Sequence, residues 1–314
     1  MMTRPLVSII TPTYNCGKYL KECIESVLAQ DYPNIEHVIQ DGASTDNSVK
    51  ILKKYSSQKY KGEIKWISEP DDGQVDGLNR AIQRSKGEII LVLNADDALL
   101  PDACSWAVKQ MARYRKAAVV YGDQYLVDAK GNITGIGVTG EFNFEKFLCV
   151  EQYMATQAAF IRRSMFEKVG LYADTSLETM PDYEIWSRIS SKYPMKYVPK
   201  IITRYRIYPH MDGKNPRSAK RFIKAKSTVL ERILKSPKTP TEIKQLRKRA
   251  YAGMYLWVAE EMINIGNVKD FFWYLAKATI TYPKKTTFNR AKLLLGEKFI
   301  RKYQVIPKLW IKIP

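Results

Sequence analysis

The sequence predicts an α/β protein: a mostly parallel mixed sheet flanked by helices, followed by an all-helical extension. As far as Arg115, short apolar runs alternate with amphipathic helical periods, a pattern typical of a parallel sheet covered by helices. Beyond Asn215 nearly every segment has helical periodicity, and this part carries most of the net positive charge. We therefore expect an α/β domain over residues 1–214 and a basic helical extension over residues 215–314.

The first half of the sheet is predicted from four apolar runs, each followed by a helical period. We expect strands at 6–11, 36–40, 64–68 and 88–93, and helices at 19–30, 48–56, 76–85 and 102–115. A turn is expected at Pro12–Asn15. Asp102 follows Pro101 and is expected to cap the fourth helix.

The pattern then changes. A strand is predicted at 119–121, a hairpin around 128–132, a helix near 144–149, a strand at 158–161, a helix at 182–191 and a strand at 201–207. The helical extension is expected to break at 236–241, where two prolines occur, and again at Pro283.

Composition excludes several classes of protein. With 45% hydrophobic residues and 20 Tyr among 314 residues, the chain has the composition of a globular protein. Its longest apolar runs are about five residues, well short of the roughly 18 that span a bilayer. The first residues lack the apolar core of a secretion signal. We expect a cytoplasmic protein, either free or bound peripherally at the inner face of the cell membrane.

The few cysteines and histidines argue against a zinc site and against a protein nucleophile. Four Cys form no CxxC pair, and the two His show no zinc-ligand spacing. Neither His lies in a recognisable catalytic motif. We expect all four thiols to be reduced, most of them in the core.

Acidic residues stand where apolar runs end. Asp41 follows the second run, Asp96 and Asp97 follow the fourth, and Asp182 opens a helical period. An open α/β sheet presents ligand-binding groups at the carboxyl ends of its strands. Adjacent carboxylates can hold a hard divalent cation, which in turn binds phosphates. This arrangement predicts an enzyme for a phosphorylated substrate.

Five segments in order resemble a known family. They are SIITPTYN (8–15), DGASTD (41–46), EPDDGQVDGLNRA (69–81), LNADD (93–97) and DYEIWSR (182–188). Each is weak alone, but together they resemble the large inverting glycosyltransferase family 2, which has the nucleotide-sugar-binding GT-A fold. The resemblance covers roughly residues 5–210 and leaves the extension outside.

The resemblance implies a role for each donor-side residue. Pro12 and Tyr14 would border the nucleobase, and Asp41 would accept a hydrogen bond from the ring N–H of a uracil-like base, a donor that suits a carboxylate. Asp96 would approach the ribose, and Asp97, together with Asp96, would hold Mg²⁺ or Mn²⁺. The side chains lining the rest of the donor cleft would be Asp71, Asp76 and Asn79.

On the acceptor side, the resemblance makes Asp182 the general base. A single inversion needs one base and no protein nucleophile. Two positions depart from the pattern: Asn94 stands where many relatives have Asp, and Pro181 stands where some have Glu. Tyr208 occupies the place of a His that often reaches the phosphates, and His210, two residues on, is a candidate substitute.

Simpler interpretations of these residues remain open from sequence alone. Asp41 with Gly42 is a common turn pair, and Asp97 is a common turn residue. Asp182 can cap its helix as well as act as a base. Tyr14 can be a core aromatic.

The basic charge lies in the extension. Residues 215–314 hold 23 Lys and Arg against 6 Asp and Glu, and residues 1–214 hold the remaining 28 against 26. We expect this charge to form a surface separate from the acidic site. A solvated face, attachment to anionic lipid and a protein partner stay open. Nucleic-acid binding is the weakest alternative, because no recognised motif accompanies the charge.

The sequence therefore predicts an inverting glycosyltransferase of the hexosyltransferase type. It would move a sugar from a nucleotide-diphosphate donor, of UDP type, to a hydroxyl of a glycan or lipid-linked glycan, as in surface polysaccharide synthesis. The alternatives are a catalytically degenerate nucleotide-sugar-binding or scaffold protein and, more remotely, a nucleic-acid-binding protein.

Overall fold

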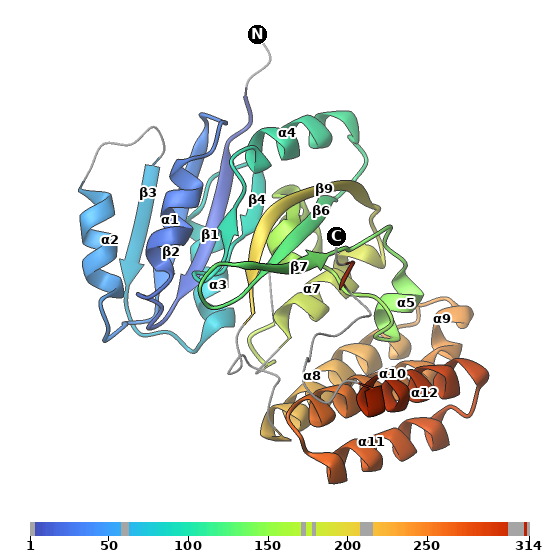
Figure 1. Ribbon diagram of the computed structural model, residues 1–314. Coiled ribbons are helices and arrows are strands. Elements are labelled where there is room, and N and C mark those ends of the chain that lie inside the picture. Colours follow the sequence, from blue (N-terminus) through green and yellow to red (C-terminus); the bar gives the residue numbers. More distant parts are fainter. Residues whose placement is uncertain are drawn as a thin grey trace.

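The parallel half of the sheet has the expected order of strands and helices. The computed structural model describes residues 4–57, 63–170, 174–177, 180–207 and 219–294, with the backbone alone of 216–218, 295–300 and 311–312. The strands run in the order β3-β2-β1-β4 and are parallel (Figure 1). Their bounds are Val7–Thr13 for β1, Ile35–Asp41 for β2, Glu63–Ser68 for β3 and Ile89–Val92 for β4.

The connecting helices are α1 (Leu20–Leu28), α2 (Ser48–Ser56), α3 (Gln74–Arg84) and α4 (Ala103–Arg113). The expected ends of these strands and helices lie within two residues of the observed ones. The turn expected at Pro12–Asn15 begins later, because Thr13 stays in register with Asp41 and extends β1. Asp102 is the N-cap of α4 but makes no side-chain cap hydrogen bond; its carboxylate pairs with Lys200 instead.

The other half of the sheet is mostly antiparallel. β8 (Ala159–Arg162) lies between β4 and β6 (Val119–Val127), antiparallel to both, and β6 forms the expected hairpin with β7 (Ile133–Gly137). β9 (Met195–Arg206) runs parallel to β6 and pairs with the short β5 (Ala98–Leu99). β10 (Ile311–Lys312) pairs with β7.

β9 is longer than the strand expected at 201–207. Pro199 interrupts its first half at a shift in register against β6, which hides the periodicity of the preceding residues.

Two apolar layers enclose the sheet. Alternate residues point to opposite faces, so Ile9 packs with α1 and α4 while its neighbour Ile10 packs with α3. The α3 face also receives α7 (Pro181–Ser190), through Tyr183, Ile185 and Trp186. The smaller helices here are α5 (Phe144–Leu148), η1 (Thr156–Ala158) and α6 (Ser164–Val169).

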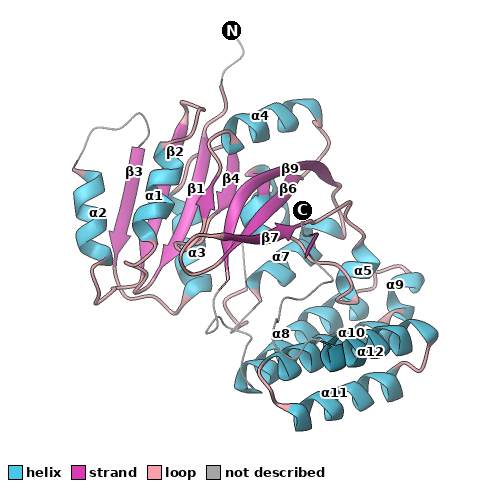
Figure 2. Cartoon of the chain, in the orientation of Figure 1, coloured by secondary structure: helices cyan, strands magenta, loops and turns pink. Residues whose placement is uncertain are grey.

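The extension consists of helices, as Figure 2 shows. They are α8 (Pro216–Lys235), α9 (Thr241–Gln245), α10 (Arg247–Asn264), α11 (Val268–Thr281) and α12 (Lys285–Ile300), with breaks where the sequence predicts them. Among the residues with described coordinates, no helix is both long and apolar enough to cross a bilayer. The expected domain boundary at 214/215 lies outside the described residues.

The extension is packed tightly onto the α/β part. Ala225 and Val229 of α8 belong to the apolar layer that contains Tyr183. Gly253 of α10 lies so close to the carbonyl oxygen of Cys149 that an added Cβ would be 1.8 Å from it. Arg249 of α10 forms two hydrogen bonds with Glu151. The two parts therefore share core and polar contacts.

Candidate active site

Asp41 ends β2 at the carboxyl edge of the parallel strands. Strand register places it beside Thr13 of β1 and Ser68 of β3. Its carboxylate is fully buried and accepts hydrogen bonds from the Ser44 N–H (2.9 Å), the Ser44 hydroxyl (2.5 Å) and the Ser68 hydroxyl (2.6 Å). Carboxylate oxygens offer about four lone pairs, so one site remains on Oδ1. Its contact with a uracil-like base stays a prediction.

The loops after β1 and β2 are fastened to each other. Asn15 (φ 50°) and Ala43 (φ 59°) both adopt the left-handed region, which is costly for non-glycine residues. The Asn15 N–H donates to the Ser44 hydroxyl, and the Asn15 side-chain oxygen accepts from the Thr45 N–H, both at 2.8 Å. Sequence reasoning missed Asn15 and Ser44 as supporting residues, although both lie inside the matched motifs.

Tyr14 projects from these fastened loops. Its side chain is 65% exposed, so the interpretation of Tyr14 as a core aromatic is wrong. Pro12, two residues earlier, lies in the strand beside Gln40 and is buried. A rigid loop that presents an exposed ring offers a stacking face to a planar base.

Asp71 lies close to Asp41 across two glycines. Its carboxylate packs at 3.0 Å from where a Cβ of Gly42 would stand and at 2.9 Å from that of Gly77. Burial raises the pKa of Asp71, and the negative charges of Asp76 and Asp41 add to this rise. A hydrogen bond from the Gly73 N–H to the carboxylate opposes it. Both glycines are therefore needed for this close approach.

The other two donor-side candidates lie on α3. Asp76 pairs with Arg80 at 2.7 Å and also accepts from the Asp72 N–H at 3.2 Å. Asn79 is 4% exposed. Asp76 thus has a clear structural task in holding the start of α3, and its contact with a donor stays a prediction.

Asp96 and Asp97 follow β4, and Arg206 at the end of β9 holds them. The Arg206 N–H donates to Asp97 Oδ1 (2.9 Å), and its Nε donates to the main-chain oxygen of Asp96 (2.9 Å). Asn94 donates to Asp97 Oδ2 at 3.2 Å, so the residue that departs from the family pattern supports the second acid. Arg206 is 2% exposed and was not anticipated from sequence.

The two acids create a concentration of negative charge. Burial and then the charge of Asp96 raise the pKa of Asp97 well above its usual range. Burial raises the pKa of the Cys16 thiol to about 12, and Asp96, Asp46 and Asp97 add to this rise. In the described part of the chain no cluster of three or more His, Cys, Asp or Glu could hold a metal by itself.

This donor set nevertheless fits a magnesium-like ion. Such an ion usually takes one or two carboxylates and completes its shell with phosphate and water. Asp96 is partly exposed and Asp97 is a buried carboxylate whose ionised form is disfavoured where it lies. A divalent cation would compensate that charge.

Asp182 occupies the first turn of α7. Pro181 begins the helix after Met180, which has a left-handed φ of 62°, and Asp182 Oδ1 accepts from the Tyr183 N–H at 2.8 Å. Burial raises the pKa of Asp182, while the charge of Lys226 opposes that rise. The residue thus combines the helix-start position with a carboxylate poised to take a proton.

Two tyrosines connect Asp182 with the paired acids. Burial raises the pKa of Tyr153, and the charges of Asp182 and Asp97 raise it further. The pKa of Tyr205 is raised by burial and then by Tyr153, Asp97, Asp96 and Asp182. Each phenol therefore lies within electrostatic range of both Asp182 and Asp97.

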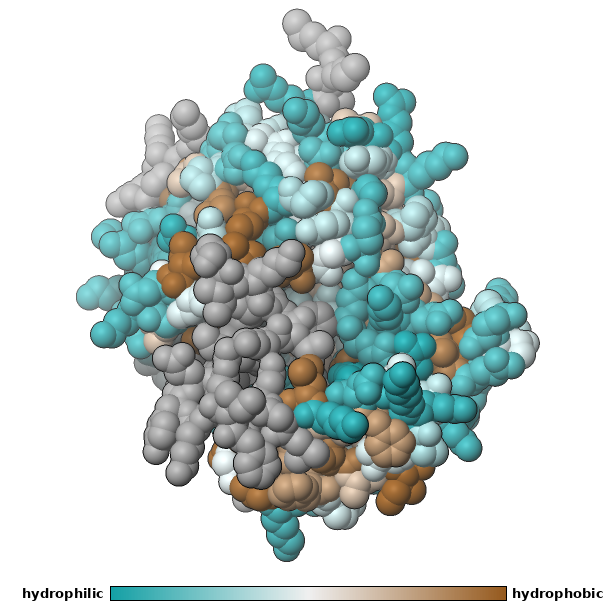
Figure 3. All heavy atoms as spheres, turned by 45° about the vertical axis from the view of Figure 1, so that its right-hand side comes forward, coloured by the Kyte–Doolittle hydropathy of each residue, from teal (hydrophilic) through white to brown (hydrophobic). Residues whose placement is uncertain are grey.

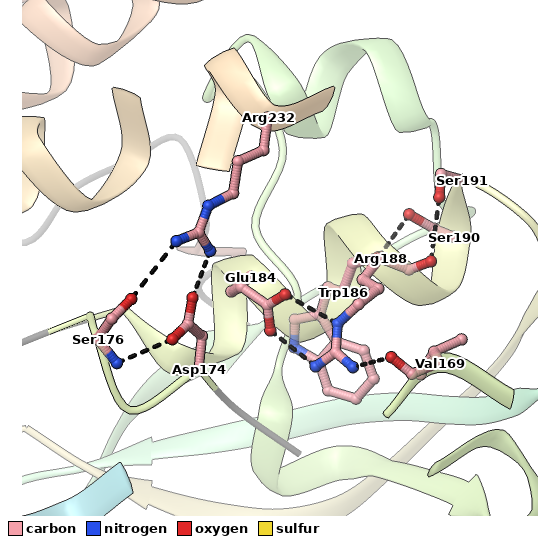
Figure 4. A network of polar contacts seen from close by, with 9 residues as sticks. All are labelled: Val169, Asp174, Ser176, Glu184, Trp186, Arg188, Ser190, Ser191 and Arg232. Carbon is pink, nitrogen blue, oxygen red and sulfur yellow. Dashed lines mark hydrogen bonds and ion pairs between the residues drawn. The ribbon is translucent and has the colours of Figure 1, made fainter. Parts of the chain in front are cut away.

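The far side of α7 is braced by ion pairs. Figure 4 shows Arg188 bonded to Glu184 one turn earlier, at 2.8 Å for each nitrogen, and to the main-chain oxygen of Val169. Arg232 of α8 reaches Asp174 in the same view. The Arg188 contacts hold the helix that carries Asp182 to the end of α6. His210 and Tyr208 lie outside the described residues.

The comparisons with known proteins agree with this geometry. The sequence profile of Glycosyl transferase family 2 matches residues 8–170. The chain is 30% identical over 202 residues to the chondroitin synthase of Escherichia coli. The matched region covers 63% of this chain and 28% of the synthase. The chain thus spans less than a third of that relative.

Two solved structures share the fold. One is S. aureus TarS 1–349 in complex with UDP, with a TM-score of 0.57, 16% identity and coverage of 96% of this chain and 94% of that one. The other is the mannosyltransferase PcManGT of Pyrobaculum calidifontis in complex with GDP-Man and Mn²⁺, with a TM-score of 0.61, 18% identity and coverage of 96% and 82%. The fold is GT-A, as the sequence predicts.

Proposed function

This chain belongs to glycosyl transferase family 2, whose profile matches more than half of it, and from that premise we propose that it is an inverting, metal-assisted glycosyltransferase. The observation that carries the proposal is the pairing of β5 with β9, which sets Ala98 opposite Arg204 and so brings Asp97 and Tyr205 together. The charges of both Asp97 and Asp182 raise the pKa of Tyr205, which supports their being near each other. A base together with a pair of phosphate-side acids is what a single displacement at an anomeric carbon requires.

The donor would be a nucleotide-diphosphate sugar, of UDP type. The exposed ring of Tyr14 offers the base a stacking face beside Pro12, and Asp41 lies at the end of the neighbouring strand. Asp96 would approach the ribose, with Asp71, Asp76 and Asn79 along the rest of the donor side. S. aureus TarS has been solved with UDP, and PcManGT with GDP-Man, which supports a nucleotide-bound donor without deciding the base.

Asp97, with Asp96, would hold Mg²⁺ or Mn²⁺. A bound divalent cation offsets the negative charge that develops on the leaving diphosphate. The chain's own contribution is to position the two acids: Arg206 and Asn94 hold both carboxylate oxygens of Asp97.

Asp182 would act as the general base. The acceptor hydroxyl oxygen forms a bond to the anomeric carbon while its proton passes to the carboxylate of Asp182. The bond between the anomeric carbon and the diphosphate oxygen breaks, and the nucleoside diphosphate leaves with its electron pair. Inversion follows because attack and departure occur on opposite faces.

Two variants test the site. Asp182→Asn is expected to keep donor binding and to lose transfer by at least about 10²-fold, the usual contribution of a general base. Asp97→Ala is expected to abolish the rise in melting temperature that UDP causes with Mn²⁺. Normal transfer by the first variant, or full Mn²⁺-linked stabilisation of the second, would contradict the assigned role. A panel of nucleotide sugars with and without Mn²⁺ in the same assay would identify the donor.

The acceptor would be a hydroxyl of a glycan or a lipid-linked glycan. The chondroitin synthase of E. coli supports a place in polysaccharide synthesis for this family branch. A catalytically degenerate binding or scaffold protein is the alternative. Asp182 argues against it, since a protein without transfer activity has no need for a carboxylate whose pKa is raised by burial at this position.

We also propose that the extension attaches the enzyme to an anionic membrane surface. Phe272, Trp273 and Ile280 of α11 are 51%, 55% and 80% exposed, whereas Phe271 and Tyr274, on either side of the first two, are buried. Figure 3 shows hydrophobic side chains gathered along the lower edge of the molecule, where Figure 1 places α11. The neighbouring Lys269 is exposed and Lys277 lies 4.7 Å from the Trp273 ring centroid.

Apolar side chains among lysines suit an interface with anionic lipid, where each cation contributes about 1 kcal/mol. Sedimentation with phosphatidylglycerol vesicles should fall at least tenfold in Phe272→Ser/Trp273→Ser, while vesicles of phosphatidylcholine retain little of either protein. Unchanged sedimentation of the variant would contradict the proposal. So would a competition experiment in which added DNA removes the wild-type protein from the vesicles. A protein attached in this way would lie peripherally, and we propose the inner face of the cell membrane as its location.

A further inference from the structure

Lys226 belongs to the basic extension but lies in the interior beside α7. Its side chain is 8% exposed, and its Nζ is 3.8 Å from the centroid of the Tyr183 ring and 5.0 Å from that of Phe222. Tyr183 directly follows Asp182 and donates its N–H to that carboxylate. The expectation that the extension's charge is separate from the acidic site is therefore wrong at this residue.

The position of Lys226 is fixed by the packing of α8. Ala225, one residue before, and Val229, three residues after, enter the apolar layer that contains Tyr183 and Trp186. The adjoining stripe of α8 packs into the core of the extension through Phe222 and Leu230, which lie one turn before and one turn after Lys226. Further along the helix, Arg232 pairs with Asp174, which precedes α7 (Figure 4). The helix cannot turn Lys226 outward without breaking both layers.

The ammonium influences the carboxylate electrostatically. Burial raises the pKa of Asp182 and Lys226 lowers it; in return, burial lowers the pKa of Lys226 to about 7, and Asp182 opposes that fall. From the other elements, the neutral phenols of Tyr153 and Tyr205 also face Asp182. Among these neighbours, Lys226 supplies the positive charge.

We propose that Lys226 is a positioning residue for the general base: its ammonium keeps the carboxylate of Asp182 ionised, so that the extension completes the active site. This inference rests on the proposed function, because it assumes that Asp182 accepts the acceptor's proton. A buried carboxylate without a nearby cation would be protonated over more of the working pH range and would be a poorer base.

The first test compares pH profiles of Lys226→Met, Lys226→Arg and a matched control, Lys220→Met, which removes an exposed lysine of the same helix. The measured rate is UDP release from the nucleotide sugar that the thermal-shift panel selects. An opposite charge at close range shifts a carboxyl pKa by roughly one to three units. The acidic limb of Lys226→Met should therefore move up by about one unit, which is a roughly tenfold loss of rate at the acidic end of the profile, where the pH lies below the limb of both proteins.

At pH 9 the carboxylate is ionised with or without Lys226, so the rate of Lys226→Met should return to within about threefold of the wild type. Lys226→Arg and Lys220→Met should keep the wild-type limb. A loss that is equal at every pH would mean that Lys226 only supports the fold, and an unmoved limb would mean that it does not act on Asp182. Either result overturns the inference.

A second measurement does not depend on activity or on the stability of a Lys226 variant. In protein labelled with ¹⁵N-lysine, the Lys226 ammonium should titrate well below the surface lysines, and lower still in Asp182→Asn, because the carboxylate that favours its charged form is gone. If the Lys226 ammonium titrates at the same pH in Asp182→Asn as in the wild type, the inference is overturned while the proposed function still stands. Full transfer by Asp182→Asn would instead overturn the proposed function, so the two failures can be told apart.

Discussion

Arg206 offers a quantitative test of how the acidic pair is held. The side chain is 2% exposed and donates to the main-chain oxygens of Asp96 (2.9 Å) and Asp128 (3.0 Å) and to the carboxylate of Glu22. Its guanidinium also lies 4.5 Å from the centroid of the Tyr19 ring. Arg206→Met removes these side-chain contacts but keeps the main-chain N–H of residue 206, which donates a hydrogen bond to Asp97.

The expected cost follows from burial. A hydrogen bond to a charged group contributes about 1.5–3 kcal/mol, and removing one member of a buried charge cluster costs about 3–5 kcal/mol, since the remaining charge is left uncompensated. We expect Arg206→Met to lose about 3–5 kcal/mol, or on the order of 10 °C in melting temperature. Glu22 is 42% exposed, so Glu22→Gln should cost less than about 1 kcal/mol.

The assay is thermal unfolding without ligand, for the single variants Arg206→Met, Glu22→Gln and Asp97→Asn and for Arg206→Met combined with Asp97→Asn. The charge of Arg206 opposes the rise in the pKa of Asp97 and so favours the ionised form of that carboxyl. Asp97→Asn has no ionised form for Arg206 to favour, so the double variant should be more stable than the sum of the singles by at least about 1 kcal/mol. The reasoning is refuted if Arg206→Met costs no more than Glu22→Gln, or if the two losses at 206 and 97 simply add.

Three further predictions concern other parts of the chain. Gly253→Ala should destabilise the protein by more than about 2 kcal/mol in chemical denaturation, because its Cβ would meet the carbonyl oxygen of Cys149 at 1.8 Å; a loss below 0.5 kcal/mol would mean that the extension is not held there. Burial alone would raise the pKa of Glu36, but hydrogen bonds from Ser8, the Lys86 N–H and Lys65 leave it lowered. Its stabilising contribution is therefore present above its usual pKa of 4.5 and is lost as the pH falls through the lower folded value. The stability gap between wild type and Glu36→Gln, measured from pH 7 to pH 3, should shrink below about pH 4.5, and a gap that widens there would contradict this assignment. Tyr14→Ala should weaken UDP binding about tenfold in calorimetry, the worth of one stacking contact, while leaving the melting temperature of the free protein unchanged, since the ring is 65% exposed; equal affinity would exclude a stacking role.

The local elements could be predicted because each has its own periodicity. The helix at Ser48–Ser56 was predicted with its observed bounds, and the breaks at 236–241 and Pro283 separate the helices of the extension. The acids at strand ends also followed from the pattern, because Asp41 is the last residue of β2 and its buried position is set by the strand register. β9 was only half predicted, since Pro199 and a register shift conceal its first residues.

The sequence by itself determined the α/β and helical periods, the family and the acids that the proposed chemistry would use, because each depends on neighbouring residues in the chain. Only the tertiary structure decided which distant groups surround those acids. Arg206 lies 109 residues after Asp97 and donates its main-chain N–H to that carboxylate, a contact that no sequence pattern predicts. From sequence, Lys226 cannot be distinguished from the other lysines of a basic helix. The packing of α8 against α7 buries it over the ring of Tyr183, the residue after Asp182. Burial strengthens the electrostatic interaction between such charged groups, because water screens charges in a protein interior much less than charges at the surface.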